Sequence, residues 1–194
     1  MGEAVHTFAA AQEFPLFAAL GMLLHGWART ELGQWEAGLA QMAQGLEAWQ
    51  RTGARLYEPY FLALLAAAHG HVGQSAAGLR LLAEALAAVA HTCERWWEAE
   101  LYRLKGELLM AQRGGELPQG EDADACFHQA LIVARHQQAK SLELRAAMSL
   151  ARLWQQQGKR AEAHELLAPV YGWFTEGFDT ADLQEAKALL DALA

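Results

Sequence analysis

The sequence has few cysteines and fewer cationic than acidic residues. Its two cysteines, Cys93 and Cys126, lie outside any CxxC pair, so the chain has no disulfide framework. We expect both thiols to be unpaired and buried as small apolar groups, as in proteins of a reducing compartment. The 15 lysines and arginines are outnumbered by 23 acidic residues, and the net charge is −8. Because phosphates attract clustered cationic residues, this balance argues against a nucleic-acid partner.

Long apolar runs are also missing. The longest, residues 60–68, is far shorter than the roughly 18 residues of a membrane-spanning helix. No basic segment leads into the apolar residues 16–24, so we predict no signal peptide. We therefore expect a cytoplasmic protein without a membrane partner.

No motif for catalysis or metal binding is present. The eight histidines include no HExxH pair. The segment 73–77 approaches a nucleophile elbow, but helical patterns flank it where an elbow needs a preceding strand. Residues 115–120 have the glycine spacing of a phosphate-binding loop, yet Glu121 and Asp122 replace the required Lys and Ser/Thr. We expect no enzyme, no metal site and no cofactor.

What the sequence does contain is a repeat. The segment 33–39, Gly-Gln-Trp-Glu-Ala-Gly-Leu, returns forty residues later as Gly-Gln-Ser-Ala-Ala-Gly-Leu at 73–79. A more divergent copy begins at Gly158. Self-similarity at a fixed period of this size is typical of helical repeat arrays.

Between the glycines, apolar residues recur at the spacing of one helix face, and no strand-like alternation occurs. We predict an all-α fold, a right-handed superhelix of about four hairpins plus a terminal helix. The predicted helices span residues 15–32, 35–51, 57–72, 75–92, 95–113, 122–138, 141–157, 160–176 and 180–193. Residues 4–12 fit the tail of a further helix. As a single domain, residues 1–194 would hold repeats at about 14–53, 54–93, 94–139 and 140–177, with the terminal helix at 179–194.

Local features support these helix ends and raise three further expectations. Gly33, Gly73 and Gly158 each follow a helix, where a left-handed backbone is needed, and we expect a kink or break at Pro169. The recurring carboxylates Glu58, Glu98 and Glu143 suggest a shared role at the junctions, such as capping or pairing with Arg95 or Arg145. Ala37 and Ala77 follow a turn glycine by four, where we expect close helix packing. Of the seven tryptophans, we expect most in the core and one or two exposed as binding anchors.

The spacing of small residues resembles the tetratricopeptide repeat. Gly26 lies seven residues before Gly33, as the glycine of that family does, and Ala163 follows Gly158 by five. In the last unit, residues 150, 151 and 154 stand where the family has Leu, Gly and Tyr. The period of forty exceeds the family's 34 or so, and HEAT-type repeats, which have this length, remain an alternative.

Nearly the whole chain is similar to the C-terminal helical region of large bacterial signalling proteins. The segments that carry this likeness are residues 94–108, 140–150 and 158–190. Those proteins join a nucleotide cyclase or DNA-binding module to a STAND-type ATPase and then to tetratricopeptide-like repeats. The resemblance implies a non-catalytic interaction scaffold, the sensor or partner-binding region of a larger regulator.

In tetratricopeptide arrays the first helix of each pair lines the binding groove. Carried over to this sequence, the groove residues are Trp27, Glu31, Tyr60, Ala63, Ala67, His71, Arg103, Glu107, Arg145, Met148, Arg152 and Gln156. This lining runs from aromatic to basic, so we expect a protein or peptide partner that is acidic and has one apolar anchor. The alternatives are a solvated groove, a groove filled by the terminal helix, a small-ligand sensor and a dimerisation module.

Overall fold

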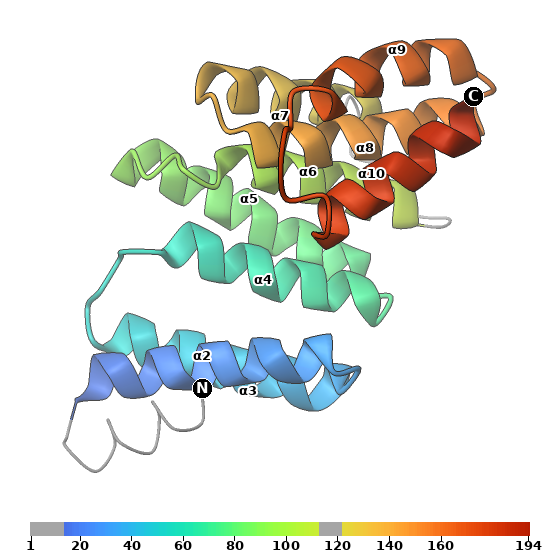
Figure 1. Ribbon diagram of the computed structural model, residues 1–194. Helices are drawn as coiled ribbons and strands as arrows, with labels where there is room; N and C mark the ends of the chain where they lie inside the picture. The colour runs from blue at the N-terminus through green and yellow to red at the C-terminus, as the bar shows by residue number, and fades with distance from the viewer. Residues whose placement is uncertain (1–13, 113–121) are drawn as a thin grey trace. The chain divides into compact units, whose positions relative to one another are not determined.

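Figure 1 shows the computed structural model, which describes residues 14–112 and 122–194. This part of the chain forms nine helices and no strand, packed as consecutive antiparallel hairpins with a terminal helix. The helices are α2 (Pro15–Glu31), α3 (Trp35–Arg51), α4 (Glu58–His71), α5 (Ser75–Thr92), α6 (Glu98–Ala111), α7 (Ala123–His136), α8 (Lys140–Gln156), α9 (Arg160–Tyr171) and α10 (Ala181–Leu193). The predicted all-α hairpin fold is confirmed. None of the described helices combines the length and apolar character needed to cross a bilayer.

The chain divides into two compact units between Glu94 and Arg95. The N-terminal unit contains α2–α5 and the C-terminal unit contains α6–α10. This boundary lies one residue from the predicted boundary between the repeats at 54–93 and 94–139.

Most helix ends lie within three residues of their predicted positions, and α9 is the exception. It ends at Tyr171 rather than 176, and because Pro169 lies inside it, the helix does not break there; the expected kink stays a prediction. Pro169 falls in the last turn, where only one backbone hydrogen bond is lost, and Gly172 N–H still donates to Ala168 O at 2.9 Å. The predicted helix at 4–12 and the loop at 114–120 lie outside the described residues.

The hairpin turns have the geometry that their glycines predict. Gly33, Gly73 and Gly158 have φ angles of +79°, +75° and +80°. A left-handed residue directly after a helix lets the next backbone N–H groups reach its last carbonyls, as Gln34 N–H does to Arg29 O at 2.9 Å. The repeat in sequence is therefore a repeat of one turn geometry.

Within the first hairpin the two helices touch at glycines. A Cβ atom on Gly38 would lie 2.7 Å from the carbonyl oxygen of Gly26, and one on Gly26 would lie 2.9 Å from that of Gly38. Ala37 is exposed, so the expected close packing at that position is wrong. Each residue rotates the side-chain direction by about 100°, so the close-packed position is one residue later. The equivalent residues Gly78 and Ala163 are also buried.

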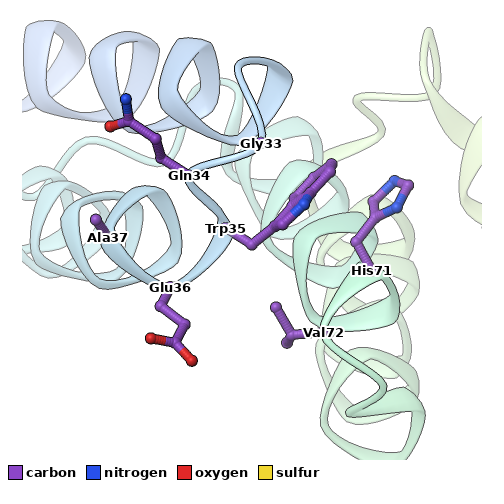
Figure 2. Close-up of a pocket in the computed structure, with 7 residues that line it drawn as sticks. All are labelled: Gly33, Gln34, Trp35, Glu36, Ala37, His71 and Val72. Atoms are coloured by element: carbon purple, nitrogen blue, oxygen red, sulfur yellow. The ribbon is translucent and has the colours of Figure 1, made fainter.

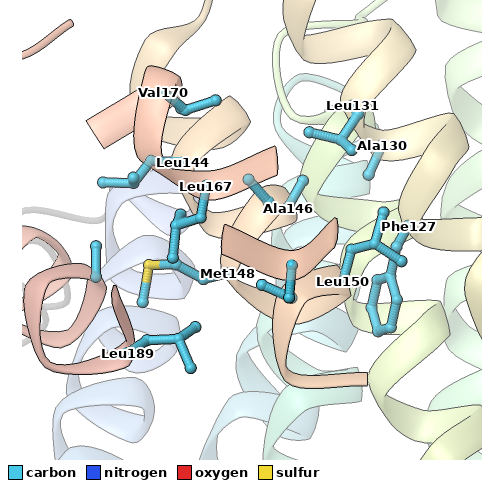
Figure 3. Close-up of a cluster of buried hydrophobic side chains, with 14 of the residues drawn as sticks. Phe127, Ala130, Leu131, Leu144, Ala146, Met148, Leu150, Leu167, Val170 and Leu189 are labelled. Atoms are coloured by element: carbon cyan, nitrogen blue, oxygen red, sulfur yellow. The ribbon is translucent and has the colours of Figure 1, made fainter. Parts of the chain in front are cut away.

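The core of the C-terminal unit gathers residues from four helices (Figure 3). Phe127 of α7, Leu150 of α8 and Leu167 of α9 are almost fully buried. On α10, Leu183, Ala186, Leu189 and Leu193 are buried in the same cluster. This spacing puts them on one side of α10, which packs against α8 and α9.

The tryptophans and cysteines only partly follow expectation. Trp49 is the one tryptophan with a buried side chain, at 3% exposure, and it packs edge-on against Phe61 of α4. The expectation that most tryptophans are core residues is wrong. Cys93 and Cys126 form no disulfide, as predicted, and Cys126 is buried. Cys93 is exposed because it ends α5 in a left-handed conformation, with φ of +58°.

The junction carboxylates share ion pairing as their role, but only Glu98 has an expected partner, Arg95, and none of the three caps its helix. Glu58, Glu98 and Glu143 are all buried at the start of a first helix. Glu58 pairs with Arg55 at 3.2 Å and Glu98 with Arg95 at 3.0 Å. Glu143 pairs with two cationic side chains, Arg135 at 2.9 Å and Lys140 at 2.7 Å.

Candidate partner-binding faces

The repeat provides a common register for the first helices of the hairpins. Residues of α2, α4 and α8 correspond when they lie at the same distance from the turn glycine, and α6 is placed by its junction carboxylate Glu98, the counterpart of Glu143. Three positions per helix, one helical turn apart, form what we call the face positions. They are Leu20, Leu24 and Trp27 on α2, Tyr60, Leu64 and Ala67 on α4, Glu100, Leu104 and Glu107 on α6, and Arg145, Ser149 and Arg152 on α8.

In the C-terminal unit, we call the six face positions of α6 and α8 the ionic face. Hydrogen bonds join the two helices there. Arg103 of α6 donates to both carboxylate oxygens of Glu100, at 2.7 and 2.8 Å, and also pairs with Glu107. Ser149 of α8 donates to Glu107 at 3.0 Å. Burial lowers the pKa of the Arg103 guanidinium. The hydrogen bond and charge of Glu100, with the charges of Glu107 and Asp182, outweigh burial and hold that pKa above its ordinary value.

The terminal helix supplies the remaining partners of this face. Arg145 pairs with Asp182 of α10 at 2.7 Å and lies 3.7 Å from Glu100. Arg152 pairs with Glu185 of α10 at 2.9 Å. Among the described helices, α10 packs against α8 and α9 but not against α6, so it continues the row of first helices beside α8.

These pairs overturn the expectation of a basic lining. Every arginine of the ionic face, together with Arg103, has a carboxylate partner, so no guanidinium there awaits an acidic ligand. The spacing of Glu100, Arg103 and Glu107 along one helix could have revealed part of this network. Nothing in the sequence showed that Asp182 and Glu185 would lie against α8.

Two predicted groove residues are in the core. Ala63 is 1% exposed and Met148 is 3% exposed, so neither side chain can contact a partner. They correspond in register to Arg103, whose side chain is only 14% exposed. Side chains at this register position, Ala63, Arg103 and Met148, therefore point between helices rather than toward solvent. Gln156, the last residue of α8, is exposed.

The N-terminal unit carries apolar residues at all six face positions of α2 and α4, which we call the apolar face. Trp27 is 39% exposed, while Leu20, Leu24, Leu64, Ala67 and Tyr60 are half-buried. Burial raises the pKa of the Tyr60 hydroxyl. Helices α2 and α4 contact each other, and in the C-terminal unit the equivalent positions Glu100 and Arg145 lie 3.7 Å apart. The apolar face is therefore a partly exposed hydrophobic strip.

Glu31 and His71, also predicted groove residues, lie at the turn end of this unit. Glu31 follows Trp27 by one turn and is exposed. His71 of α4 stacks on Trp35 of α3, with ring centroids 4.2 Å apart and planes 19° from parallel. This pair lines an open hollow of about 580 Å³. Figure 2 shows the two rings side by side among the residues of that lining.

The hollow offers little to a small ligand. Its lining is Gly33, Gln34, Trp35, Glu36, Ala37, His71 and Val72. The side chains of Gln34 and Glu36 point away from the stacked Trp35 and His71 (Figure 2). Small-molecule sites usually have polar groups that converge on the ligand. Among the described residues, no group of three His, Cys, Asp or Glu side chains is arranged to hold a metal ion.

Comparison with known proteins adds no family to this description. No protein-family model matches the sequence, and no curated protein matches it either.

Proposed function

We propose that this chain is a non-catalytic protein-interaction scaffold of tetratricopeptide-like hairpins. We further propose that it is the partner-binding region of a larger bacterial regulator, as the resemblance of residues 94–108, 140–150 and 158–190 implies. The partner segment would bind on the apolar face of the N-terminal unit.

The observation that carries this proposal is the exposed Trp27 on helices whose other face positions are half-buried and apolar. Trp27 leaves 39% of its surface to solvent, and Leu24 on its own helix and Ala67 at the equivalent position of α4 are half-buried. Exposed apolar patches of this kind mark interaction surfaces, and tryptophan is among the residues most enriched at binding hot spots. The equivalent positions on α6 and α8 are satisfied internally by ion pairs, so the apolar face is the better candidate.

The packing of the hairpins supports a tetratricopeptide-like array. The register that puts Gly26 against Gly38 also puts small, buried residues at Ala66, Gly106 and Ala151. Small residues at these places let the two helices of a hairpin approach closely. Stacked hairpins of this kind leave the first helices available as a binding surface.

The proposal can be tested without knowing the partner. Peptides would be selected from a random display library on the immobilised protein, and their dissociation constants measured by fluorescence anisotropy. We expect Trp27→Ala to weaken binding at least about tenfold, as loss of a hot-spot residue does. Trp173→Ala, which removes another exposed tryptophan on the loop after α9, should leave the affinity unchanged.

Two outcomes would contradict the proposal. If selection enriches no peptide over a bare-resin control, the chain is not a peptide-binding scaffold. If selected peptides bind Trp27→Ala and the parent equally, the site lies elsewhere. Circular dichroism of each variant would verify that the helices remain folded.

A further inference from the structure

The charges around the apolar face are unevenly distributed. None of its six positions carries a charge, whereas Glu31 lies one turn beyond Trp27 on the same side of α2. Glu36 follows in the first turn of α3, across the hairpin turn from Glu31. Both glutamates are exposed, and neither forms an ion pair within the described residues.

The nearest cation in sequence does not neutralise them. Arg29 donates instead to the side-chain oxygens of two glutamines, Gln34 at 3.0 Å and Gln41 at 3.3 Å. This differs from the ionic face, where Glu100 and Glu107 both pair with Arg103. Arg29 keeps its own positive charge, so at the turn of this hairpin two glutamates face one arginine and the local balance is negative.

We propose that the apolar face takes a basic amphipathic segment of a partner protein, a proposal that rests on the proposed function. Apolar side chains of the segment would cover Trp27 and Leu24, and a lysine or arginine would lie against Glu31. The net charge of −8 would also favour encounter with a cationic segment. The proposed partner is therefore basic, whereas the sequence predicted an acidic partner from the arginines of α8. Those arginines are already paired with carboxylates.

The division of roles follows from the energies involved. Exposed ion pairs contribute little affinity, whereas apolar anchors in an interface contribute much. The apolar strip therefore supplies most of the binding, and the glutamates select the sign of the partner's charge and raise the association rate.

The test uses two synthetic amphipathic helical peptides with identical leucine and tryptophan positions. One carries lysine at every polar position and the other carries glutamate. Their dissociation constants would be measured by fluorescence anisotropy at physiological ionic strength. We expect the lysine peptide to bind at least about tenfold more tightly than the glutamate peptide, as charge complementarity favours the right partner and penalises the wrong one.

A matched pair of variants locates the effect. The double variant Glu31→Gln, Glu36→Gln should weaken the lysine peptide about three- to tenfold, the range expected for one or two exposed pairs. The control is Glu162→Gln, Glu165→Gln, two exposed positions on α9 that change the net charge by the same amount. We expect this control to bind like the parent.

The inference is overturned if the glutamate peptide binds as tightly as the lysine peptide, or if neither binds. It is also overturned if both double variants lose the same affinity, since the effect would then come from net charge alone. Library peptides that bind in a Trp27-dependent manner but carry no positive charge would refute the basic partner while leaving the proposed function intact.

Discussion

The two units place different chemistry at the same positions of the repeat. In the N-terminal unit the face positions are apolar, with Trp27 partly exposed. In the C-terminal unit five of the six equivalent positions are polar or charged, and their charges are paired within the unit. The side chains at these positions differ, and the C-terminal unit also has α10, whose Asp182 and Glu185 pair with arginines of the ionic face.

The two faces also differ in the free energy that each would gain from a bound partner. An apolar face exposed to water gains free energy when a partner covers it. A face of paired charges gains little from a new partner, because each group would exchange one ionic contact for another. A helical array can therefore confine binding to one region without changing its fold.

Removal of Arg103 should have the largest effect on stability. Glu100, whose side chain is 6% exposed, would keep a buried charge without its closest partner. We expect Arg103→Met to lower the free energy of unfolding by about 3–5 kcal/mol, the usual cost of breaking a buried pair. Urea denaturation would measure this loss.

Arg152→Met is the matched control for that prediction. It breaks a pair whose partners are 42% and 59% exposed, and such surface pairs contribute about 0–1 kcal/mol. Equal losses in the two variants would show that the ionic face is not held by its buried pair.

The comparison of the units depends on the register in which α3 packs against α2. Substitutions at the adjacent residues Gly38 and Ala37 test that register. Gly38→Leu should destabilise the protein by about 1–3 kcal/mol or more, because its side chain would collide with the backbone of Gly26. Ala37→Leu changes an exposed position and should stay within about 0.5 kcal/mol of the parent. Thermal melts that rank these two variants in the reverse order would contradict the register.

Both units have junction carboxylates, and removal of one of them should lower the stability by a smaller amount that depends on pH. Burial raises the pKa of Glu143, but hydrogen bonds from Lys140 and Arg135 outweigh it and hold that pKa below its ordinary value. The stabilisation is therefore complete above the pKa that Glu143 has in the unfolded chain, about 4.3. It is lost as the pH falls through the lower pKa of the folded state.

Melting temperatures of the parent and of Glu143→Gln would be compared from pH 7 to pH 3. We expect the parent to be more stable at pH 7 and the difference to shrink as the pH falls below the unfolded pKa. A difference that is constant across this range would mean that the ionisation of Glu143 does not stabilise the fold.

Much of the fold could be predicted because its determinants are local. Turn glycines such as Gly33 specify a left-handed backbone, and the Arg95–Glu98 pair joins two residues only three apart, at the connection into α6. Helical periodicity gave most helix ends to within three residues. Each of these features depends on residues that are close together in the sequence.

The surface was less predictable because it depends on contacts between distant residues. Arg145 was expected to face a partner, yet Asp182 neutralises it from a helix much later in the chain. Met148 was placed in the groove by counting from a glycine, and it is instead buried against the core. Periodicity gives the spacing of side chains on a helix, but the rotation of that helix against its neighbours is set by packing.

One measurement tests the central claim most directly. Trp27 and Arg152 occupy the same face position in the two units, and both are accessible. The affinity of a library-selected peptide would be compared for Trp27→Ala and Arg152→Ala by fluorescence anisotropy. We predict a loss of at least about tenfold for Trp27→Ala and an unchanged affinity for Arg152→Ala. The opposite result, with Arg152→Ala weakened and Trp27→Ala unchanged, would place the binding site on the ionic face and contradict this account.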